Sequence, residues 1–361
     1  MEQPLVLVTG SSGLIGRAVM DRLAGVYDVV GLSRSHTSGA PGDFVEIDVT
    51  SDESVRAALD KVRERHGHEV ASVVHLAAYY DFSGKPSPLY EKVTVEGTRR
   101  LIQALQNFSI EQFWFSSTML VHAPAEQPGD EVEESDELRP EWDYPRSKVA
   151  TEKLLRAERV EIPIVLARIA GVYDEWGHSI PIAHQIKRIV ERDVTAYVFP
   201  GDPSHGQAFL HLADLVDAVE RSIDRRRDLP PELPVLLGER KAMSYDASQD
   251  EIGRLLYGTG NWATIRIPKP LAKLGAWGQD LLGEPFIKPW MIEFADDQYE
   301  LDVDRACNAL GWEPRHSLRA TLPTIVGNFL ADPERWYDEN DFNPATLPEE
   351  WRQTPAPLRG C

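Results

Sequence analysis

A tyrosine and a lysine four residues apart, Tyr144 and Lys148, could together move a proton. On a helix this spacing brings both side chains to one face. A tyrosine titrates near pH ~10, and a neighbouring ammonium lowers its pKa by favouring phenolate. Tyr144 could then exchange a proton with a substrate oxygen. The spacing is common by chance, so it gains meaning only together with other motifs. A third polar partner is expected at the end of the preceding strand, where three hydroxyls stand: Ser116, Ser117 and Thr118.

A glycine-rich turn, Thr9-Gly-Ser-Ser-Gly-Leu-Ile-Gly16, separates a short apolar run from a helical pattern. Gly10 permits a tight turn, Gly13 lets the backbone approach a pyrophosphate, and Gly16 allows the helix to pack closely on the sheet. Free N–H groups at the start of the helix attract phosphates. An ordinary strand-to-helix turn is the alternative. The sequence predicts a dinucleotide site formed by Gly10, Ser12, Gly13, Leu14, Ile15 and Gly16.

The end of the second strand bears on which dinucleotide binds. NAD-specific sites usually have a carboxylate there for the ribose 2′-hydroxyl. This chain has Ser33 and Arg34 instead, and a guanidinium suits a 2′-phosphate. We therefore expect NADP to be preferred, with NAD possible. Asp48 and Val49 follow the third strand, where the carboxylate could meet the adenine amino group, although a plain helix-entry turn explains them nearly as well.

The elements that position these residues alternate between strands and helices. The pattern predicts strands over 5–8, 28–32, 43–47, 70–76, 112–116, 162–168 and 234–238, and a long helix over 88–106. Such alternation predicts an α/β fold with a Rossmann-type, doubly wound parallel sheet. We expect residues 1–170 and 208–240 to form the dinucleotide-binding domain. Residues 171–207 and 241–340 would form a smaller interleaved substrate lobe, and 341–361 an extended tail.

Composition excludes several classes of protein. The chain has 361 residues, 42% of them hydrophobic, and a formal net charge of -20. The negative charge argues against nucleic-acid binding. Two cysteines without paired spacing favour a reducing compartment, so we expect a cytoplasmic protein without a signal peptide or integral membrane segment. HExxH and cysteine-rich spacings are absent from the sequence, so no metal site is predicted.

Taken in order, these motifs resemble the short-chain dehydrogenase/reductase superfamily in its extended, epimerase/dehydratase-like branch. The likeness covers about residues 4–240, with a weaker echo at 304–314. It rests on the glycine-rich turn, Asp48, His75-Leu-Ala-Ala78, Gly97-Thr98, Ser116-Ser-Thr118, Tyr144 with Lys148, and Arg168 to Tyr173.

The resemblance implies a catalytic triad of Thr118, Tyr144 and Lys148, with Lys148 also holding the nicotinamide ribose and homodimers formed through the long helices. It adds contacts with the cofactor by Leu76, Ala77, Ala78, Ser116, Ser117, Ile169 and Ala170. It also implies contacts with a small-molecule substrate by Tyr80, Asp81, Thr118 and Gly171.

Departures from the family pattern narrow the chemistry. The Asp-Glu pair that dehydratases carry after the triad hydroxyl is here Met119-Leu120. Gly171 and Gln207 replace the asparagine and arginine with which sugar-nucleotide members meet the diphosphate, and Thr94 replaces an asparagine. Residues 79–84 loosely resemble the hydroxysteroid dehydrogenase and dihydroflavonol reductase groups.

We therefore expect an NAD(P)-dependent oxidoreductase that acts on a carbonyl or alcohol of a fairly apolar molecule. An NAD-dependent sugar epimerase using the same triad and a non-catalytic dinucleotide sensor are the alternatives. An apolar, tryptophan-containing helix near 271–290 could be a lid, a membrane-surface patch or plain packing.

Overall fold

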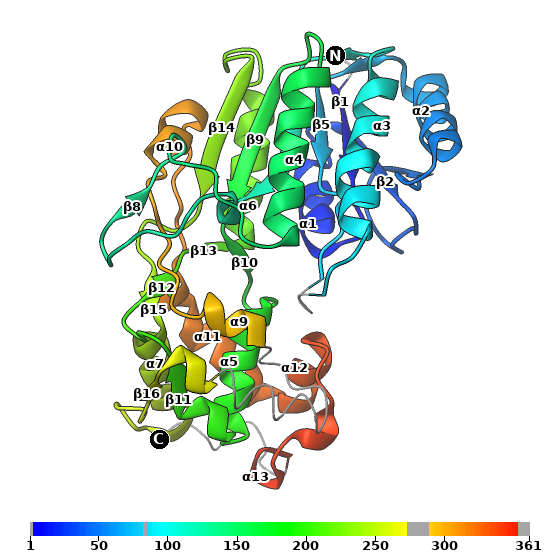
Figure 1. The fold of residues 1–361 in the computed structure, drawn as a ribbon. Helices are drawn as coiled ribbons and strands as arrows, with labels where there is room; N and C mark the ends of the chain where they lie inside the picture. Colours follow the sequence, from blue (N-terminus) through cyan, green and yellow to red (C-terminus); the bar gives the residue numbers. More distant parts are fainter. Residues whose placement is uncertain (1–2, 82–84, 273–288, 353–361) are drawn as a thin grey trace.

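A seven-stranded parallel sheet forms the centre of the larger domain in the computed structural model, which describes residues 3–81, 85–272 and 289–352 (Figure 1). The strand order is β14-β9-β7-β5-β1-β2-β3, and every pairing is parallel. This confirms the predicted fold class. The strands are β1 (Leu5–Thr9), β2 (Asp28–Ser33), β3 (Asp43–Glu46), β5 (Ser72–His75), β7 (Phe113–Thr118), β9 (Ile164–Ile169) and β14 (Glu232–Leu237).

The chain reverses its direction of travel across the sheet between β1 and β5. From β1 it builds outward through β2 and β3, and it then returns to add β5 on the other side of β1. Ligands of doubly wound sheets bind outside the carboxyl ends of the strands at such a switch point. The glycine-rich turn follows β1, and His75 ends β5, so both lie at this point.

Helices cover both faces of the sheet because the apolar residues of each strand alternate between them. In β1, Val6 and Val8 join one core cluster, whereas Leu5 and Leu7 join the other. The first cluster is covered by α1 (Leu14–Leu23), α6 (Leu212–Asp224) and α10 (Asp304–Leu310). The second is covered by α2 (Asp52–His66), α3 (Glu96–Leu105) and α4 (Asp143–Glu158).

The helix predicted over 88–106 consists of two parts. Residues Tyr90–Val95 form a π-helical segment, η1, which continues directly into α3. The Thr98 hydroxyl donates to the Thr94 carbonyl (2.6 Å) across the junction. Segments of π-helix occur frequently at functional sites, and this one packs against α4, which carries Tyr144.

A smaller lobe lies beyond the carboxyl ends of the strands (Figure 1). Its core contains Ile186, Ile252, Phe329 and Trp336. Its main helices are α5 (Ile180–Val190), α7 (Tyr245–Tyr257), α11 (Leu318–Ala331) and α12 (Pro333–Glu339). Short paired strands complete it or join it to the sheet domain: β10 (Gly171–Tyr173) with β13 (Phe209–His211), β11 (Val198–Pro200) with β16 (Ile265–Ile267), and β12 (Gly206–Gln207) with β15 (Met243–Ser244).

The remaining described elements are short. They are β4 (Glu69–Val70), β6 (Ser109–Ile110), β8 (Glu131–Val132), β17 (Glu300–Leu301), η2 (Met119–Val121), η3 (Val194–Ala196), η4 (Pro344–Thr346), α9 (Pro289–Glu293) and α13 (Glu349–Arg352).

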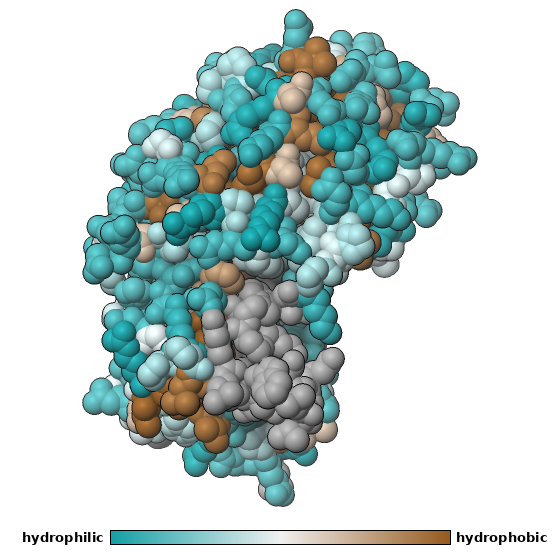
Figure 2. All heavy atoms as spheres, viewed as in Figure 1, coloured by the Kyte–Doolittle hydropathy of each residue, from teal (hydrophilic) through white to brown (hydrophobic). Residues whose placement is uncertain are grey.

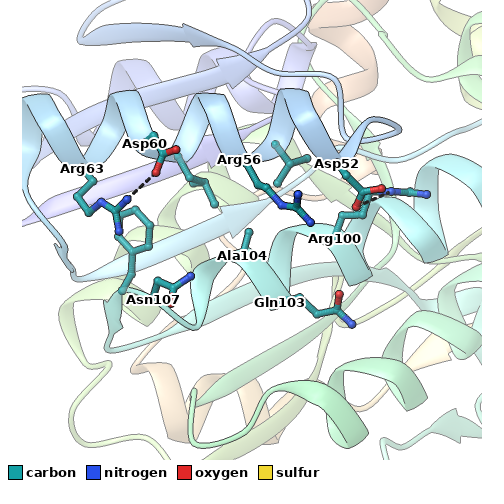
Figure 3. A pocket seen from close by; sticks show the side chains of 11 residues that line it. Asp52, Arg56, Asp60, Arg63, Arg100, Gln103, Ala104 and Asn107 are labelled. Carbon is teal, nitrogen blue, oxygen red and sulfur yellow. Dashed lines mark hydrogen bonds and ion pairs between the residues drawn. The ribbon is translucent and has the colours of Figure 1, made fainter.

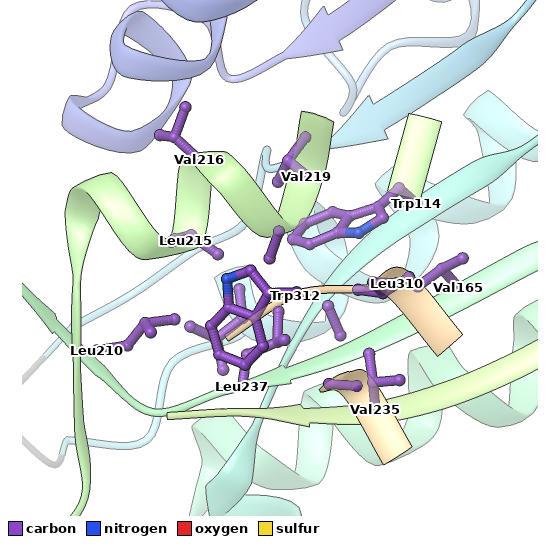
Figure 4. Packing of buried hydrophobic residues seen from close by; sticks show 14 of the residues in the cluster. Trp114, Val165, Leu210, Leu215, Val216, Val219, Val235, Leu237, Leu310 and Trp312 are labelled. Atoms are coloured by element: carbon purple, nitrogen blue, oxygen red, sulfur yellow. The ribbon is translucent and has the colours of Figure 1, made fainter. Parts of the chain in front are cut away.

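Two segments lie elsewhere than the sequence predicted. Residues 299–312, assigned to the substrate lobe, pack on the sheet domain, where Leu310 and Trp312 join the cluster around Trp114 (Figure 4). The Trp312 indole N–H also donates to the Asp214 carbonyl (2.9 Å). Residues 341–352, assigned to an extended tail, instead form η4 and α13, because Leu347 and Trp351 are buried in the core of the smaller lobe.

Hydrophilic side chains cover most of the face shown in Figure 2, as the excess of acidic residues leads one to expect. Among the described residues, no helix combines the length and apolar character that crossing a bilayer requires. Most of the apolar helix near 271–290 lies outside the described residues, as do 82–84 and 353–361.

Candidate active site

The glycine-rich turn has the close backbone packing that its sequence predicts. Gly10 adopts φ +71°, and its N–H donates to the Leu32 carbonyl (2.8 Å). A Cβ added to Gly16 would lie 2.2 Å from the Gly10 carbonyl oxygen and 2.7 Å from the Ser11 Cα. A side chain at position 16 would therefore push α1 away from the turn.

The start of α1 fits a dinucleotide phosphate. Gly13 caps the helix and is exposed, as is Leu14. The first N–H groups of a helix have no partner within it, so those of Leu14, Ile15 and Gly16 are donors available at this end of α1. The first turn contains no acidic residue that would repel an anion. Ser12, the remaining predicted turn residue, has its hydroxyl within 2.7 Å of the Ser33 hydroxyl.

The adenosine end of the predicted site lies at the ends of β2 and β3. Ser33 is buried, whereas Arg34 is exposed. One carboxylate oxygen of Asp48 accepts hydrogen bonds from the Thr50 N–H and hydroxyl, which lower the pKa of Asp48, and Arg34 adds to this effect. Val49 is buried and would touch a Cβ on Gly97, so Asp48 and Val49 also shape the entry to α2.

Thr118, Tyr144 and Lys148 meet at the carboxyl end of β7. Thr118 is the last residue of that strand, and α4 carries the other two side chains across from it. The Thr118 hydroxyl lies close enough to the Tyr144 hydroxyl to lower its pKa. The Lys148 Nζ donates to the Ser116 carbonyl (2.5 Å) and lies 5.6 Å from the centre of the Tyr144 ring.

Burial has the largest effect on the pKa values of Tyr144 and Lys148. It raises the pKa of Tyr144 to about 12, against the effect of the Thr118 hydroxyl. It lowers the pKa of Lys148 to about 7, against the attraction of Glu152. The expected lowering of the Tyr144 pKa by Lys148 is therefore absent from the protein alone, because a partly neutral lysine does not compensate for desolvation of the phenolate.

The two serines before Thr118 point in different directions, since side chains alternate along a strand. The Ser116 hydroxyl donates to the His75 carbonyl (3.0 Å), on the side of the switch point. The Ser117 hydroxyl donates instead to the buried Glu152 carboxylate (2.6 Å), which also pairs with Arg168. The structure thus places Ser116 on the same side of β7 as Thr118 and directs Ser117 into an ionic network behind the triad.

A chain of buried hydrogen bonds through His75, here called the His75 relay, connects the glycine-rich turn to α3 and to the loop that carries Tyr79. The Thr98 hydroxyl donates its proton to the Thr94 carbonyl, so it accepts the Nε2–H of His75 (2.9 Å). The His75 Nδ1 then accepts from the Thr9 hydroxyl (2.7 Å). The Thr94 hydroxyl accepts the Tyr79 N–H (3.0 Å). Burial lowers the pKa of His75 to about 3, so the ring is neutral. The sequence motif that contains His75 did not predict this role.

Aromatic rings surround the Tyr144 phenol. The Tyr80 ring meets the Tyr144 ring edge-on at 4.9 Å, and the Trp142 ring lies 5.5 Å away. Asp81, next along the loop, accepts from the Tyr79 hydroxyl (3.3 Å) and through its carbonyl from the Tyr90 hydroxyl (3.0 Å). Sequence reasoning identified Tyr80 and Asp81 but missed Trp142, which stands two residues before Tyr144.

The remaining predicted residues line the ends of neighbouring strands. The N–H groups of Leu76 and Ala77 approach the Thr9 hydroxyl at 3.2 and 3.3 Å, and Ala78 follows them. Ile169 pairs with Thr118 in the sheet, and the Ala170 N–H donates to the Leu237 carbonyl (2.8 Å). Gly171 begins β10 and leaves space for the Phe209 ring, which a Cβ would approach to 2.9 Å.

Two other features lie apart from the triad. Asp214 binds the backbone N–H groups of Arg315 and His316, and His211 accepts the Ala213 N–H, so both residues have structural partners; among the described residues, no cluster that could hold a metal ion occurs. A groove of about 310 Å³ lies between α2 and α3 (Figure 3), and none of the predicted site residues lines it.

The sheet order and the turn define a Rossmann-type dinucleotide-binding fold. Residues 6–237 match the NAD dependent epimerase/dehydratase family, and the chain belongs to this family. The chain is 24% identical over 331 residues to a UDP-glucose 4-epimerase of Vibrio cholerae, covering 90% of this chain and 95% of the relative.

Other relatives are dehydrogenases. The chain is 28% identical to an L-arabinose 1-dehydrogenase (NAD(P)(+)) of Haloferax volcanii, covering 59% of this chain and 84% of the relative. It is 26% identical to human 3 beta-hydroxysteroid dehydrogenase type 7, covering 86% and 91%. The solved Thermus thermophilus UDP-glucose 4-epimerase in complex with NAD has a TM-score of 0.66 at 20% identity, covering 90% and 98%, which shows a shared fold.

Proposed function

We propose that this protein is an NAD(P)-dependent oxidoreductase that interconverts a carbonyl group and an alcohol on a fairly apolar small molecule. The observation that carries the proposal is the meeting of Thr118, Tyr144 and Lys148 at the carboxyl end of β7, on the same edge of the sheet as a turn that fits a dinucleotide. The bound dinucleotide would supply or accept the hydride.

Each side chain of the triad has a distinct task in this reaction. The Thr118 hydroxyl binds the substrate oxygen, and the Tyr144 hydroxyl gives that oxygen a proton or takes one from it. The Lys148 ammonium favours the phenolate state of Tyr144 and binds the ribose hydroxyls. Burial raises the Tyr144 pKa to about 12, so the proposal requires added positive charge at the site to lower it during the reaction.

The rings around Tyr144 support an apolar substrate. Tyr80 and Trp142 offer apolar faces beside the phenol, and Gly171 and Gln207 provide no cation for a diphosphate. The human hydroxysteroid dehydrogenase among the relatives agrees with such a substrate.

The cofactor preference forms a second part of the proposal. Exposed Arg34 at the end of β2 suits the 2′-phosphate of NADP. Calorimetric titration with NADPH and NADH, followed by a panel of ketones and aldehydes, tests both parts. We expect tighter binding of NADPH and its oxidation with at least one apolar carbonyl. Failure to bind either dinucleotide would overturn the proposal.

A sugar epimerase is the second candidate, favoured by the UDP-glucose 4-epimerases among the relatives. It would retain NAD through purification and show no net turnover of added NADPH, which distinguishes it from the first. We also propose a cytoplasmic homodimer that associates through its long helices, which light scattering and fractionation of cells would test.

A further inference from the structure

A third residue, Glu152, continues the helical face that carries Tyr144 and Lys148. It lies four residues beyond Lys148 on α4, so the two side chains are neighbours on that face. Glu152 is 0% exposed and Lys148 is 2% exposed. Burying a carboxylate is costly unless it is paired, and the proposed reaction assigns Glu152 no task.

Three hydrogen bonds from other elements hold the Glu152 carboxylate in place. Ser117, on β7 beside Thr118, donates to Oε1 (2.6 Å). Arg168, on β9, donates its Nε to Oε1 (3.2 Å) and its Nη2 to Oε2 (2.9 Å). Burial alone would raise the pKa of Glu152, but the contacts with Arg168 and Ser117 outweigh it and keep the pKa below its ordinary value. The carboxylate is therefore ionised.

The groups that face Lys148 from neighbouring elements offer little other negative charge. On β5, His75 is neutral, and Lys148 itself helps to lower the His75 pKa. On β7, the Phe115 ring lies 4.9 Å from the Lys148 Nζ, and the Ser116 carbonyl accepts its hydrogen bond. On α4, the Tyr144 phenol is neutral in the protein alone.

We propose that Glu152, held by Arg168 and Ser117, is a positioning residue whose negative charge favours the ammonium form of the buried Lys148 beside Tyr144. The role of the ammonium rests on the proposed function, whereas the electrostatic link between Glu152 and Lys148 does not. The pKa of Lys148 agrees with this role, because the Glu152 charge raises that pKa against the effect of burial.

Removal of the carboxylate has a calculable consequence. Glu152→Gln preserves the shape of the side chain but removes the negative charge that favours the Lys148 ammonium, and it leaves Arg168 without its carboxylate partner. Loss of an opposite charge at close range lowers a lysine pKa by about 1 unit or more, and the charged fraction of Lys148 at pH 7 should fall from about one half to about one tenth.

The test compares the wild type with Glu152→Gln, the double variant Glu152→Gln/Arg168→Met, and Glu158→Gln. The double variant also removes the Arg168 charge that the single variant leaves without its carboxylate partner, which limits the risk of misfolding. Glu158 lies on the same helix, and its pairing with Arg99 is partly exposed (2.9 Å), which makes its variant the matched control.

Lysine NMR titration, assigned with Lys148→Met, measures the Lys148 pKa without cofactor or substrate. We expect Glu152→Gln to lower that pKa, the double variant to restore part of it, and Glu158→Gln to leave it unchanged. With an active substrate, the loss of turnover in Glu152→Gln should be larger at pH 8 than at pH 6. A Lys148 pKa at the wild-type value in Glu152→Gln, or in the double variant if the single variant does not fold, would overturn the proposal. A wild type inactive on all carbonyls would overturn the proposed function instead.

Discussion

Gly16→Ala tests whether the turn that follows β1 must pack as closely as the structure shows. The added methyl would lie 2.2 Å from the Gly10 carbonyl oxygen and 2.7 Å from the Ser11 Cα. Both are backbone atoms, which cannot rotate away as a side chain can. At Gly13 the nearest atom would be the Gly10 oxygen at 3.5 Å, an ordinary contact. The two substitutions therefore add the same group with different consequences.

The expected magnitudes follow from these distances. Overpacking of this kind costs about 1–3 kcal/mol of stability, so we expect Gly16→Ala to lower the free energy of unfolding by that amount. Movement of the α1 start should also weaken NADPH binding by roughly tenfold, equivalent to about 1.4 kcal/mol. Gly13→Ala should leave stability nearly unchanged and weaken NADPH binding, because its methyl lies on the exposed side of the turn.

Urea unfolding and calorimetric titration with NADPH measure the two effects separately. Gly327→Ala in α11 is the control, because nothing lies within 4 Å of its added Cβ; it should preserve or slightly raise stability. Wild-type stability together with wild-type NADPH affinity in Gly16→Ala would refute the reasoning.

Three further predictions concern pH, the core and the cofactor. Burial raises the pKa of Glu239 to about 7 from 4.5, so the folded state binds an extra proton between these values and stability falls as pH rises through that window. Glu239→Gln should remove up to about 3 kcal/mol of this fall. An unchanged slope of the unfolding free energy between pH 4.5 and 7.5 would contradict this prediction. Trp312→Ala should cost about 3–5 kcal/mol in urea unfolding because its ring is fully buried, and a loss under 1 kcal/mol would show that residues 299–312 do not stabilise the sheet domain. Arg34→Ser should weaken NADPH binding about tenfold and leave NADH binding unchanged in calorimetry; equal effects on both would remove Arg34 from 2′-phosphate recognition.

Local rules made much of the sheet domain predictable. A sequence shows directly where a turn has no room for a side chain, because glycine stands there. In the structure, Gly10 has a positive φ and Gly16 has no space for a Cβ. The alternation of apolar runs with helical patterns predicted strands within a few residues of β1, β2, β3 and β9. The spacing of Tyr144 and Lys148 predicted a shared helical face, and both side chains lie there.

Contacts between distant segments were not predictable in the same way. Trp312 falls in the range 241–340 that the sequence assigned to the substrate lobe, but it packs in the core of the sheet domain. Trp351 falls in a stretch rich in proline and acidic residues, and its burial depends on tertiary contacts with Tyr257 and Phe329. Burial also reversed the expected pKa shift of Tyr144, since desolvation depends on the packed surroundings rather than on the two residues alone.

The His75 relay and the Glu152 network were harder to predict from the sequence. A histidine at the end of an apolar strand and a carboxylate four residues after Lys148 are both visible in the sequence. Their partners, Thr98 and Arg168, lie on other elements, α3 and β9, which only the fold brings next to them. The predicted strand ended at residue 116, whereas β7 continues to Thr118. In the longer strand, side chains alternate between the two faces, which separates Ser117 from Ser116 and Thr118.

Tyr144→Phe tests the central claim most directly, because it removes one hydroxyl and keeps the ring beside Tyr80. In stopped-flow and calorimetric measurements with a carbonyl substrate, we expect NADPH to bind within about twofold of the wild-type affinity. NADPH oxidation should fall by about 10²–10⁴-fold. A variant that oxidises NADPH at the wild-type rate would contradict the assignment of the Tyr144 phenol as the proton donor.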